Sequence, residues 1–276
     1  MNSTPNEKML VKTAEHLNID DLLNLLKGEI LVLRIPNYYP LEEAEAISKK
    51  IVLQESLQRY HRAPDVGVKR TGVTFFETNG SFEMLERYYE EAPFLIAQLR
   101  QVCFPYLSPI DKLKLELTDI WLAGAYIENV HNRRMLAGIA RAFEHGFELP
   151  PHQDILSRDI LDSPLTARNL FQNLTTQLSS NIYLRTPEIG GELELWDLKP
   201  SWSQQQSIRD QEYKYEGIID RNNLPPAKIV IKPAVGELML FDSGCIHAVC
   251  ASSGSRVSMS MFIGYRGQDK PLTYWS

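Results

Sequence analysis

The spacing of hydrophobic positions changes near residue 118. Before this point apolar residues recur every three or four positions, as on one face of a helix, and after it they alternate with polar residues, as in strands. The first pattern predicts helices at about 19–27, 41–60 and 82–106, and another helix beginning after Ser108. A short, mostly apolar run predicts a strand at 30–35. We expect residues 1–12 to be loose and residues 61–80 to form a polar loop, which either covers a substrate or simply connects two elements.

Short alternating segments after residue 118 predict strands at 126–130, 139–143, 178–185, 192–196, 227–231, 238–241 and 256–265. One face of the last strand carries Arg256, Ser258, Ser260 and Phe262, and the residues between them are apolar. A polar face and an apolar face fit the wall of a barrel with a cofactor inside and core packing outside. The polar stretch 199–226 predicts an insertion between strands, either a lid or a surface excursion without a catalytic role.

Candidate chemistry first appears at His152 and Asp154, which are separated by one residue. In an extended strand their side chains point to the same face. His247 follows an apolar strand and a turn of small residues, and it supplies a second imidazole. Taken alone, His-x-Asp is a common pattern, and a single His beside an apolar run is more often a core residue. Two imidazoles and one carboxylate, however, form the ligand set that suits non-haem Fe(II) oxygenases.

Arg256 comes nine residues after His247, and Ser258 lies two residues further on the same strand face. A guanidinium binds a carboxylate through two parallel hydrogen bonds, which Lys cannot do. A metal triad followed by such an Arg implies a cofactor that chelates the metal at one end and has an acid at the other. 2-Oxoglutarate is such a molecule.

With these residues the sequence resembles the Fe(II)- and 2-oxoglutarate-dependent dioxygenases over roughly residues 120–266. The resemblance rests on His152-x-Asp154, His247 and Arg256-x-Ser258, and it is closest to members that act on amino acids or natural-product scaffolds. Some of these relatives are halogenases, in which Gly or Ala replaces the carboxylate ligand so that chloride can bind iron. Because Asp154 is present, the resemblance implies hydroxylation.

The resemblance also implies a fold and a set of roles. We expect a mainly β protein with flanking helices around a double-stranded β-helix, or jelly-roll, core. A single domain would span 1–276, with mostly helical support at 1–118 and the core at 119–266. His152, Asp154 and His247 would bind Fe(II), Arg256 and Ser258 would bind 2-oxoglutarate, and O2 would take the remaining iron position.

Two alternatives to hydroxylation stay open. The same cofactors can support desaturation, cyclisation or epimerisation, which the ligand set does not distinguish from hydroxylation. A cupin-like binding module without turnover would require the four candidate residues to coincide by chance.

Three residues are candidates for the substrate side of the site: Arg141, Trp196 and Phe262. A charged residue that faces the inside of a small barrel needs an acid as its partner. Arg141 therefore either contacts a substrate or cofactor carboxylate or lies on an edge strand in solvent.

Composition narrows the class of protein further. The net charge is −6 and no basic tract is present, so we expect a small-molecule substrate rather than a nucleic acid. Three cysteines are too few for a disulfide framework. No apolar run reaches the length of a membrane span, and the N-terminus lacks the apolar core of a signal peptide. We therefore expect a cytoplasmic protein without membrane partners, and the sequence indicates no oligomeric state.

Overall fold

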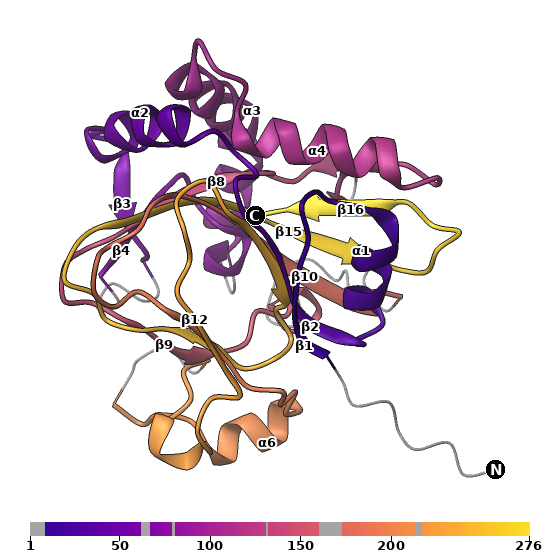
Figure 1. The fold of residues 1–276 in the computed structure, drawn as a ribbon, viewed down its shortest axis with the longest axis vertical. Coiled ribbons are helices and arrows are strands. Elements are labelled where there is room, and N and C mark those ends of the chain that lie inside the picture. The colour runs from indigo at the N-terminus through magenta and orange to yellow at the C-terminus, as the bar shows by residue number, and fades with distance from the viewer. Residues whose placement is uncertain (1–8, 62–66, 79–80, 131, 160–172, 213–216) are drawn as a thin grey trace.

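The structure is a computed structural model that describes residues 9–61, 67–78, 81–130, 132–159, 173–212 and 217–276. Its strands form two principal sheets, and the fold is a double-stranded β-helix, as the sequence predicts. Figure 1 shows the larger sheet with helices along one side and the smaller sheet on the other. The interior between the sheets contains the candidate metal ligands His152, Asp154 and His247.

The larger sheet consists of ten strands. Eight follow one another in space in the order β1 (Met9–Thr13), β2 (Ile30–Ile35), β13 (Leu238–Asp242), β10 (Thr176–Arg185), β15 (Arg256–Tyr265), β8 (Ile139–Phe143), β4 (Val68–Thr71) and β3 (Leu57–Arg59). β16 (Leu272–Trp275) pairs with β15, and β5 (Ala125–Ile127) pairs with β16. β10 and β15 lie at the centre, and their antiparallel register places Tyr183 opposite Ser258.

The smaller sheet brings the candidate metal ligands together. It has four strands in the order β12 (Ile229–Ile231), β11 (Leu193–Leu195), β14 (His247–Val249) and β9 (Leu149–His152). β14 and β9 are antiparallel, and His247 is the register partner of His152. Residues almost a hundred positions apart therefore become direct neighbours.

Helices cover the outer, apolar face of the larger sheet. They are α1 (Ile19–Leu26), α2 (Leu41–Val52), α3 (Phe82–Cys103) and α4 (Pro109–Ile120). Alternate β15 residues, from Val257 to Ile263, pack in one core with buried leucines and isoleucines of α1, α2 and α4. This burial is the main stabilising contribution, because it removes a continuous apolar surface from water. The opposite face of β15 is left for the interior.

The remaining elements are short. They are α5 (Leu156–Asp159), α6 (Trp202–Ser207), the two-stranded ribbon of β6 (Asn129–Val130) and β7 (Arg133–Arg134), and 3-10 turns at Phe75–Thr78 and Arg221–Asn223. α6 lies in the region predicted as an insertion, on the side of the smaller sheet (Figure 1).

The N-terminal part contains helices α1 to α4 and also adds strands to both edges of the larger sheet, of which only the strand at 30–35 was expected. Residues expected to be loose include β1, which pairs in parallel with β2. The helix expected to reach residue 60 ends at Val52, and β3 follows it and pairs with β4. β4 lies within the stretch expected to be a loop, of which residues 62–66 and 79–80 lie outside the described residues. Backbone pairing to an existing sheet edge recruits these segments, and side-chain spacing does not reveal it.

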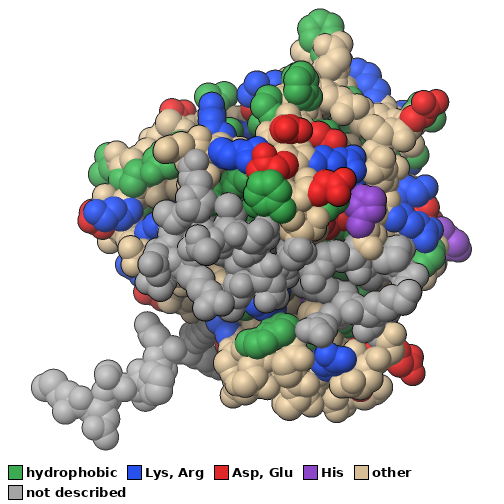
Figure 2. All heavy atoms as spheres, turned by 180° about the vertical axis from the view of Figure 1, so that it is seen from behind, with side chains coloured by type: hydrophobic (Ala, Val, Ile, Leu, Met, Phe, Trp, Pro, Cys, Tyr) green, Lys and Arg blue, Asp and Glu red, His purple; other side chains and the backbone are tan. Residues whose placement is uncertain are grey.

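The outer surface carries charges of both signs. On the face in Figure 2, acidic and basic side chains are interspersed among the described atoms. Among the described residues, no helix combines the length and apolar character needed to cross a bilayer.

Candidate active site

The two candidate histidines are held in the same tautomer by the backbone. Nδ1 of His152 lies 2.9 Å from the carbonyl oxygen of Pro150, and Nδ1 of His247 lies 2.9 Å from that of Cys245. A carbonyl oxygen only accepts, so each Nδ1 donates its hydrogen. Each Nε2 is left with a free lone pair, which is the arrangement found in metal-binding histidines.

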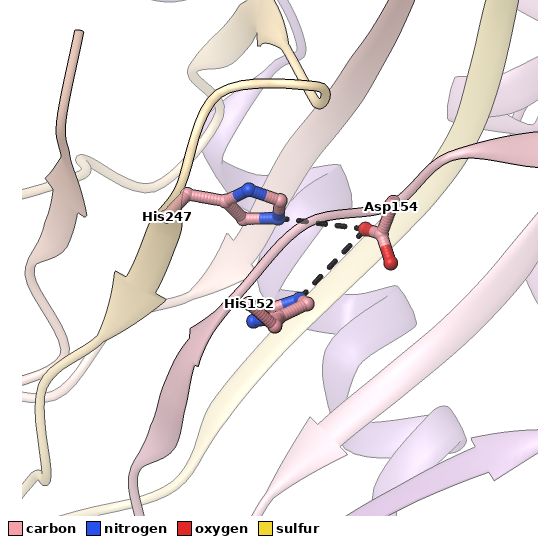
Figure 3. A group of neighbouring side chains, drawn as sticks. All are labelled: His152, Asp154 and His247. Carbon is pink, nitrogen blue, oxygen red and sulfur yellow. Dashed lines mark ion pairs between the residues drawn. The ribbon is translucent and has the colours of Figure 1, made fainter. Parts of the chain in front are cut away.

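Asp154 completes a three-residue group at the end of β9. One of its carboxylate oxygens lies 3.8 Å from Nε2 of His152 and 3.4 Å from Nε2 of His247, as Figure 3 shows. One ligand atom from each residue lies within 4.8 Å of the other two, so the group can hold one metal ion. The convergence expected from the His-x-Asp spacing is present in the structure.

Neighbouring backbone contacts fix the position of Asp154. Its N–H donates to the carbonyl oxygen of Ser243 at 3.0 Å, and the Ser243 hydroxyl donates to the carbonyl oxygen of Asp154 at 3.0 Å. The side chain of Gln153 points away from the triad and donates to the carbonyl oxygen of Gly244 at 2.6 Å. The turn before β14 is thereby tied to the end of β9, so the two ligand-bearing segments are held together.

The electrostatics of the group favour metal binding. Burial and the adjacent His247 lower the pKa of His152 to about 4, so its imidazole is neutral near pH 7. Burial would raise the pKa of Asp154, but the two imidazoles and Arg141 outweigh this effect and hold the pKa below its usual range. Neutral imidazoles and an ionised carboxylate are the protonation states that bind a metal.

A cavity extends from the triad along the inner face of the larger sheet, and Arg256 and Ser258 both line it. Nε and Nη1 of Arg256 are buried without a hydrogen-bond partner among the described residues, and so are the hydroxyl groups of Ser258 and Tyr183. Buried polar groups in folded proteins are almost always paired. These orphaned donors converge from adjacent strands, and an anion with several oxygen acceptors would satisfy them.

Aromatic rings enclose this guanidinium. The Arg256 guanidinium carbon lies 4.6 Å from the ring centre of Phe143 and 5.0 Å from that of Tyr183. Burial lowers the pKa of Arg256, yet an Arg side chain stays protonated in proteins. The site is therefore a desolvated positive charge, and such a charge binds an anion more strongly than one in water.

The expected substrate residues divide into two groups. Arg141 and Phe262 line the same cavity as the triad. Trp196 does not: its indole N–H donates to the carbonyl oxygen of Pro225 at 2.7 Å, and its ring packs in a cluster with Ile219 and Ile246. We therefore do not assign Trp196 to the substrate side. The predicted insertion contributes Ile218 to the cavity, and its residues 213–216 lie outside the described residues.

Several lining residues escaped the sequence interpretation. Alternate residues of β10 face the cavity: Gln177, Ser179, Asn181 and Tyr183. This polar alternation along one strand could have identified them. Tyr60 also lines the cavity, but it follows an edge strand that the hydrophobic pattern does not reveal.

The model of one protein family, described as the carrier-protein-independent halogenase WelO5, matches residues 11–276. The chain belongs to this family. No curated protein matches the sequence. Among solved structures, an N-substituted L-amino acid dioxygenase from Burkholderia ambifaria AMMD is similar, with a TM-score of 0.64, 20% identity, and coverage of 95% of this chain and 93% of that chain. The same dioxygenase in complex with alpha-KG gives a TM-score of 0.63 at 20% identity, with coverage of 93% and 90%.

Membership of the WelO5 family places the chain among the Fe(II)- and 2-oxoglutarate-dependent oxygenases, as the sequence resemblance indicates. Its cofactors are Fe(II) and 2-oxoglutarate, with O2 as the oxidant. The structure fits both groups, because it offers three converging ligands for the metal and unpaired buried donors for a carboxylate.

Proposed function

We propose that this protein hydroxylates an unactivated C–H bond of a small molecule, either an amino acid or an amino-acid-derived or natural-product compound. The observation that supports this proposal is the carboxylate of Asp154 beside the two imidazoles. In the halogenases that the sequence resembles, Gly or Ala at this place leaves an iron position for chloride. Here a carboxylate would fill that position.

Each cofactor has a set of residues suited to it. His152, Asp154 and His247 would hold the iron, and Arg256 with Ser258 would bind the distal carboxylate of 2-oxoglutarate. The Tyr183 hydroxyl, which is also unpaired, would be a third donor to that carboxylate. When bound, iron and 2-oxoglutarate supply an oxidant, generated from O2, that is strong enough to remove hydrogen from an unactivated C–H bond.

The protein contributes positioning and a dry environment. The carbonyl oxygens of Pro150 and Cys245 fix the two imidazoles, so the ligand set needs little rearrangement to bind metal. Phe262, Trp275 and Leu156 give the cavity an apolar wall, which excludes water and can hold one C–H bond in place. In the overall reaction, one oxygen atom of O2 enters the product as hydroxyl, and the other enters succinate as carbon dioxide leaves.

Halogenation is the second candidate, because the matching family model is that of a halogenase. It would require chloride to enter the iron coordination despite the carboxylate of Asp154. Two negatively charged ligands in adjacent positions disfavour this arrangement, since like charges repel strongly in a desolvated site.

Product analysis tests the proposal. Substrate-dependent succinate release would be screened over amino acids, their N-substituted derivatives and natural-product acids and amines, with chloride present and absent. The masses of the products would then be determined by mass spectrometry after reaction under isotopically labelled dioxygen. Hydroxylation predicts the gain of one labelled oxygen atom whether or not chloride is present. Exchange of hydrogen for chlorine would support halogenation instead, and loss of two hydrogen atoms would support desaturation.

A further inference from the structure

A second arginine of the cavity, Arg141, belongs neither to the three candidate metal ligands nor to the residues proposed to bind 2-oxoglutarate. It lies on β8, lines the cavity and keeps some accessible surface there. Its Nε donates to the hydroxyl of Tyr60 at 2.7 Å, and its Nη1 donates to the hydroxyl of Ser260. Two hydrogen bonds hold the guanidinium in one orientation, and among the described residues no acceptor pairs with Nη2. The group is therefore oriented in advance and still able to bind a ligand.

A neighbouring arginine shows what a structurally paired cation looks like in this fold. Arg70 on β4 is the register partner of Arg141 and is fully buried. Its Nε and Nη2 donate to the two carboxylate oxygens of Glu77 at 2.8 and 2.6 Å. Among the described residues, no ion pair links a carboxylate to Arg141, whose partners are neutral hydroxyls. Asp154 and Glu77 act on this charge without forming an ion pair with it, so a ligand carboxylate would be its first direct ionic partner among the described residues.

The balance of charges in the cavity with both cofactors bound also favours an anionic substrate. Arg141, Arg256 and Asp154 are the charged side chains among the described lining residues. With both cofactors bound, Asp154 and the two carboxylates of 2-oxoglutarate balance the doubly charged iron and Arg256. In this count of side chains and cofactors, the positive charge of Arg141 then remains without a carboxylate in direct contact.

We propose that Arg141 binds a carboxylate of the substrate, so that the substrate is a carboxylic acid with an apolar body. The apolar part would lie against Phe75, Phe262 and Trp275, which line the same cavity. Binding at Arg141 would fix one end of the substrate and select which C–H bond faces the iron. This inference rests on the proposed function, because it specifies the substrate class of the same site.

Calorimetric titration of the Ni(II)- and 2-oxoglutarate-loaded protein, which does not turn over, tests the inference. The probes are 3-phenylpropionate and isovalerate, each compared with its uncharged amide. At least one acid should bind ~10-fold or more tightly than its amide, which corresponds to about 1.4 kcal/mol. Arg141→Gln should abolish this preference and leave the affinity for 2-oxoglutarate unchanged. The surface variant Arg87→Gln, which breaks only an exposed pair with Glu91, should behave like the wild type.

Two results would overturn the inference. One is that neither acid binds more tightly than its amide, or that Arg141→Gln retains the preference. The other is that Arg141→Gln weakens 2-oxoglutarate itself, which would assign this guanidinium to the cofactor. If 2-oxoglutarate did not bind to the wild type, the proposed function would fail, while the acid preference and its dependence on Arg141 would still be measured on the metal-loaded protein.

A third variant keeps the inference testable if Arg141→Gln does not fold stably. Should Arg141→Gln melt far below the wild type, Tyr60→Phe removes the hydroxyl that orients Nε and leaves the guanidinium in place. It should reduce the preference for the acid about 3-fold or more, within the range expected for one hydrogen bond. An unaltered preference in this variant would count against the inference.

Discussion

Replacing Arg256 with Met should have opposite effects on the free protein and on cofactor binding. Arg256 is a buried cation whose Nε and Nη1 have no partner among the described residues. Each buried unpaired donor destabilises a folded protein by about 1–3 kcal/mol. Met fills a similar space without a charge, so we expect the free protein to become more stable by about 1–3 kcal/mol. In a chain of this size the melting temperature would rise by about 2–4 °C for each kcal/mol.

The same substitution should weaken 2-oxoglutarate. Two hydrogen bonds from a guanidinium to a carboxylate contribute about 1.5–3 kcal/mol each. Their loss, about 3 kcal/mol or more, raises the dissociation constant at least ~100-fold, since 1.4 kcal/mol corresponds to a factor of ten. Fe(II) affinity without 2-oxoglutarate should hardly change, because the three metal ligands are untouched.

Differential scanning calorimetry with and without 2-oxoglutarate measures both effects. Without 2-oxoglutarate the variant should melt above the wild type, and with millimolar 2-oxoglutarate and metal the order should reverse, because the ligand stabilises only the protein that binds it. Arg70→Met is the matched control. It leaves Glu77 buried without its partner, so it should lower the melting temperature under both conditions. A variant of Arg256 that melted lower without 2-oxoglutarate and bound it normally would refute the reasoning.

Three further predictions concern the triad and its surroundings. Asp154→Ala should reduce hydroxylation at least ~100-fold, because it removes a metal ligand rather than a supporting group; wild-type turnover by this variant in a mass-spectrometric product assay would remove Asp154 from the ligand set. Because the pKa of His152 is lowered from 6.5 to about 4, the unfolded chain takes up this proton first as the pH falls, so the unfolding free energy of the metal-free protein should decrease between about pH 6.5 and pH 4. Urea denaturation of His152→Gln should show a flatter decrease over this range, and an identical slope would contradict the assignment. Trp196→Phe should lower the unfolding free energy by about 1–3 kcal/mol, because it removes the hydrogen bond to Pro225 and some packing. The KM for the substrate should stay the same, and a raised KM would show that Trp196 contacts the substrate.

Local spacing accounts for what could be predicted of the site. A period of two placed Arg256 with Ser258, which share one face of β15. It also placed His152 with Asp154, although β9 ends at His152 and contacts with Ser243 position Asp154. The alternation on β15 correctly separated the cavity side from the core side, where Val257 and Ile263 pack.

Features that depend on contacts distant in the sequence were not predictable. β1 and β3 form because a neighbouring strand offers unpaired backbone groups, which leaves little trace in side-chain pattern. Trp196 directly follows β11, whose residue Leu193 lines the cavity. Only the folded chain shows that the indole of Trp196 reaches Pro225 instead. The contrast between Arg70 and Arg141 likewise needed coordinates, because the position of Glu77 decides which of them is paired.

Anaerobic titration with Fe(II) and 2-oxoglutarate tests the central claim most directly. The metal-to-ligand charge-transfer band reports a 2-oxoglutarate that chelates iron through its keto acid end. We predict a band that saturates at one iron and one 2-oxoglutarate per chain in the wild type, disappears in His247→Ala and requires far more 2-oxoglutarate in Arg256→Met. A wild-type protein without the band at saturating concentrations, or a band that persists in His247→Ala, would contradict the assignment of one iron to these three side chains.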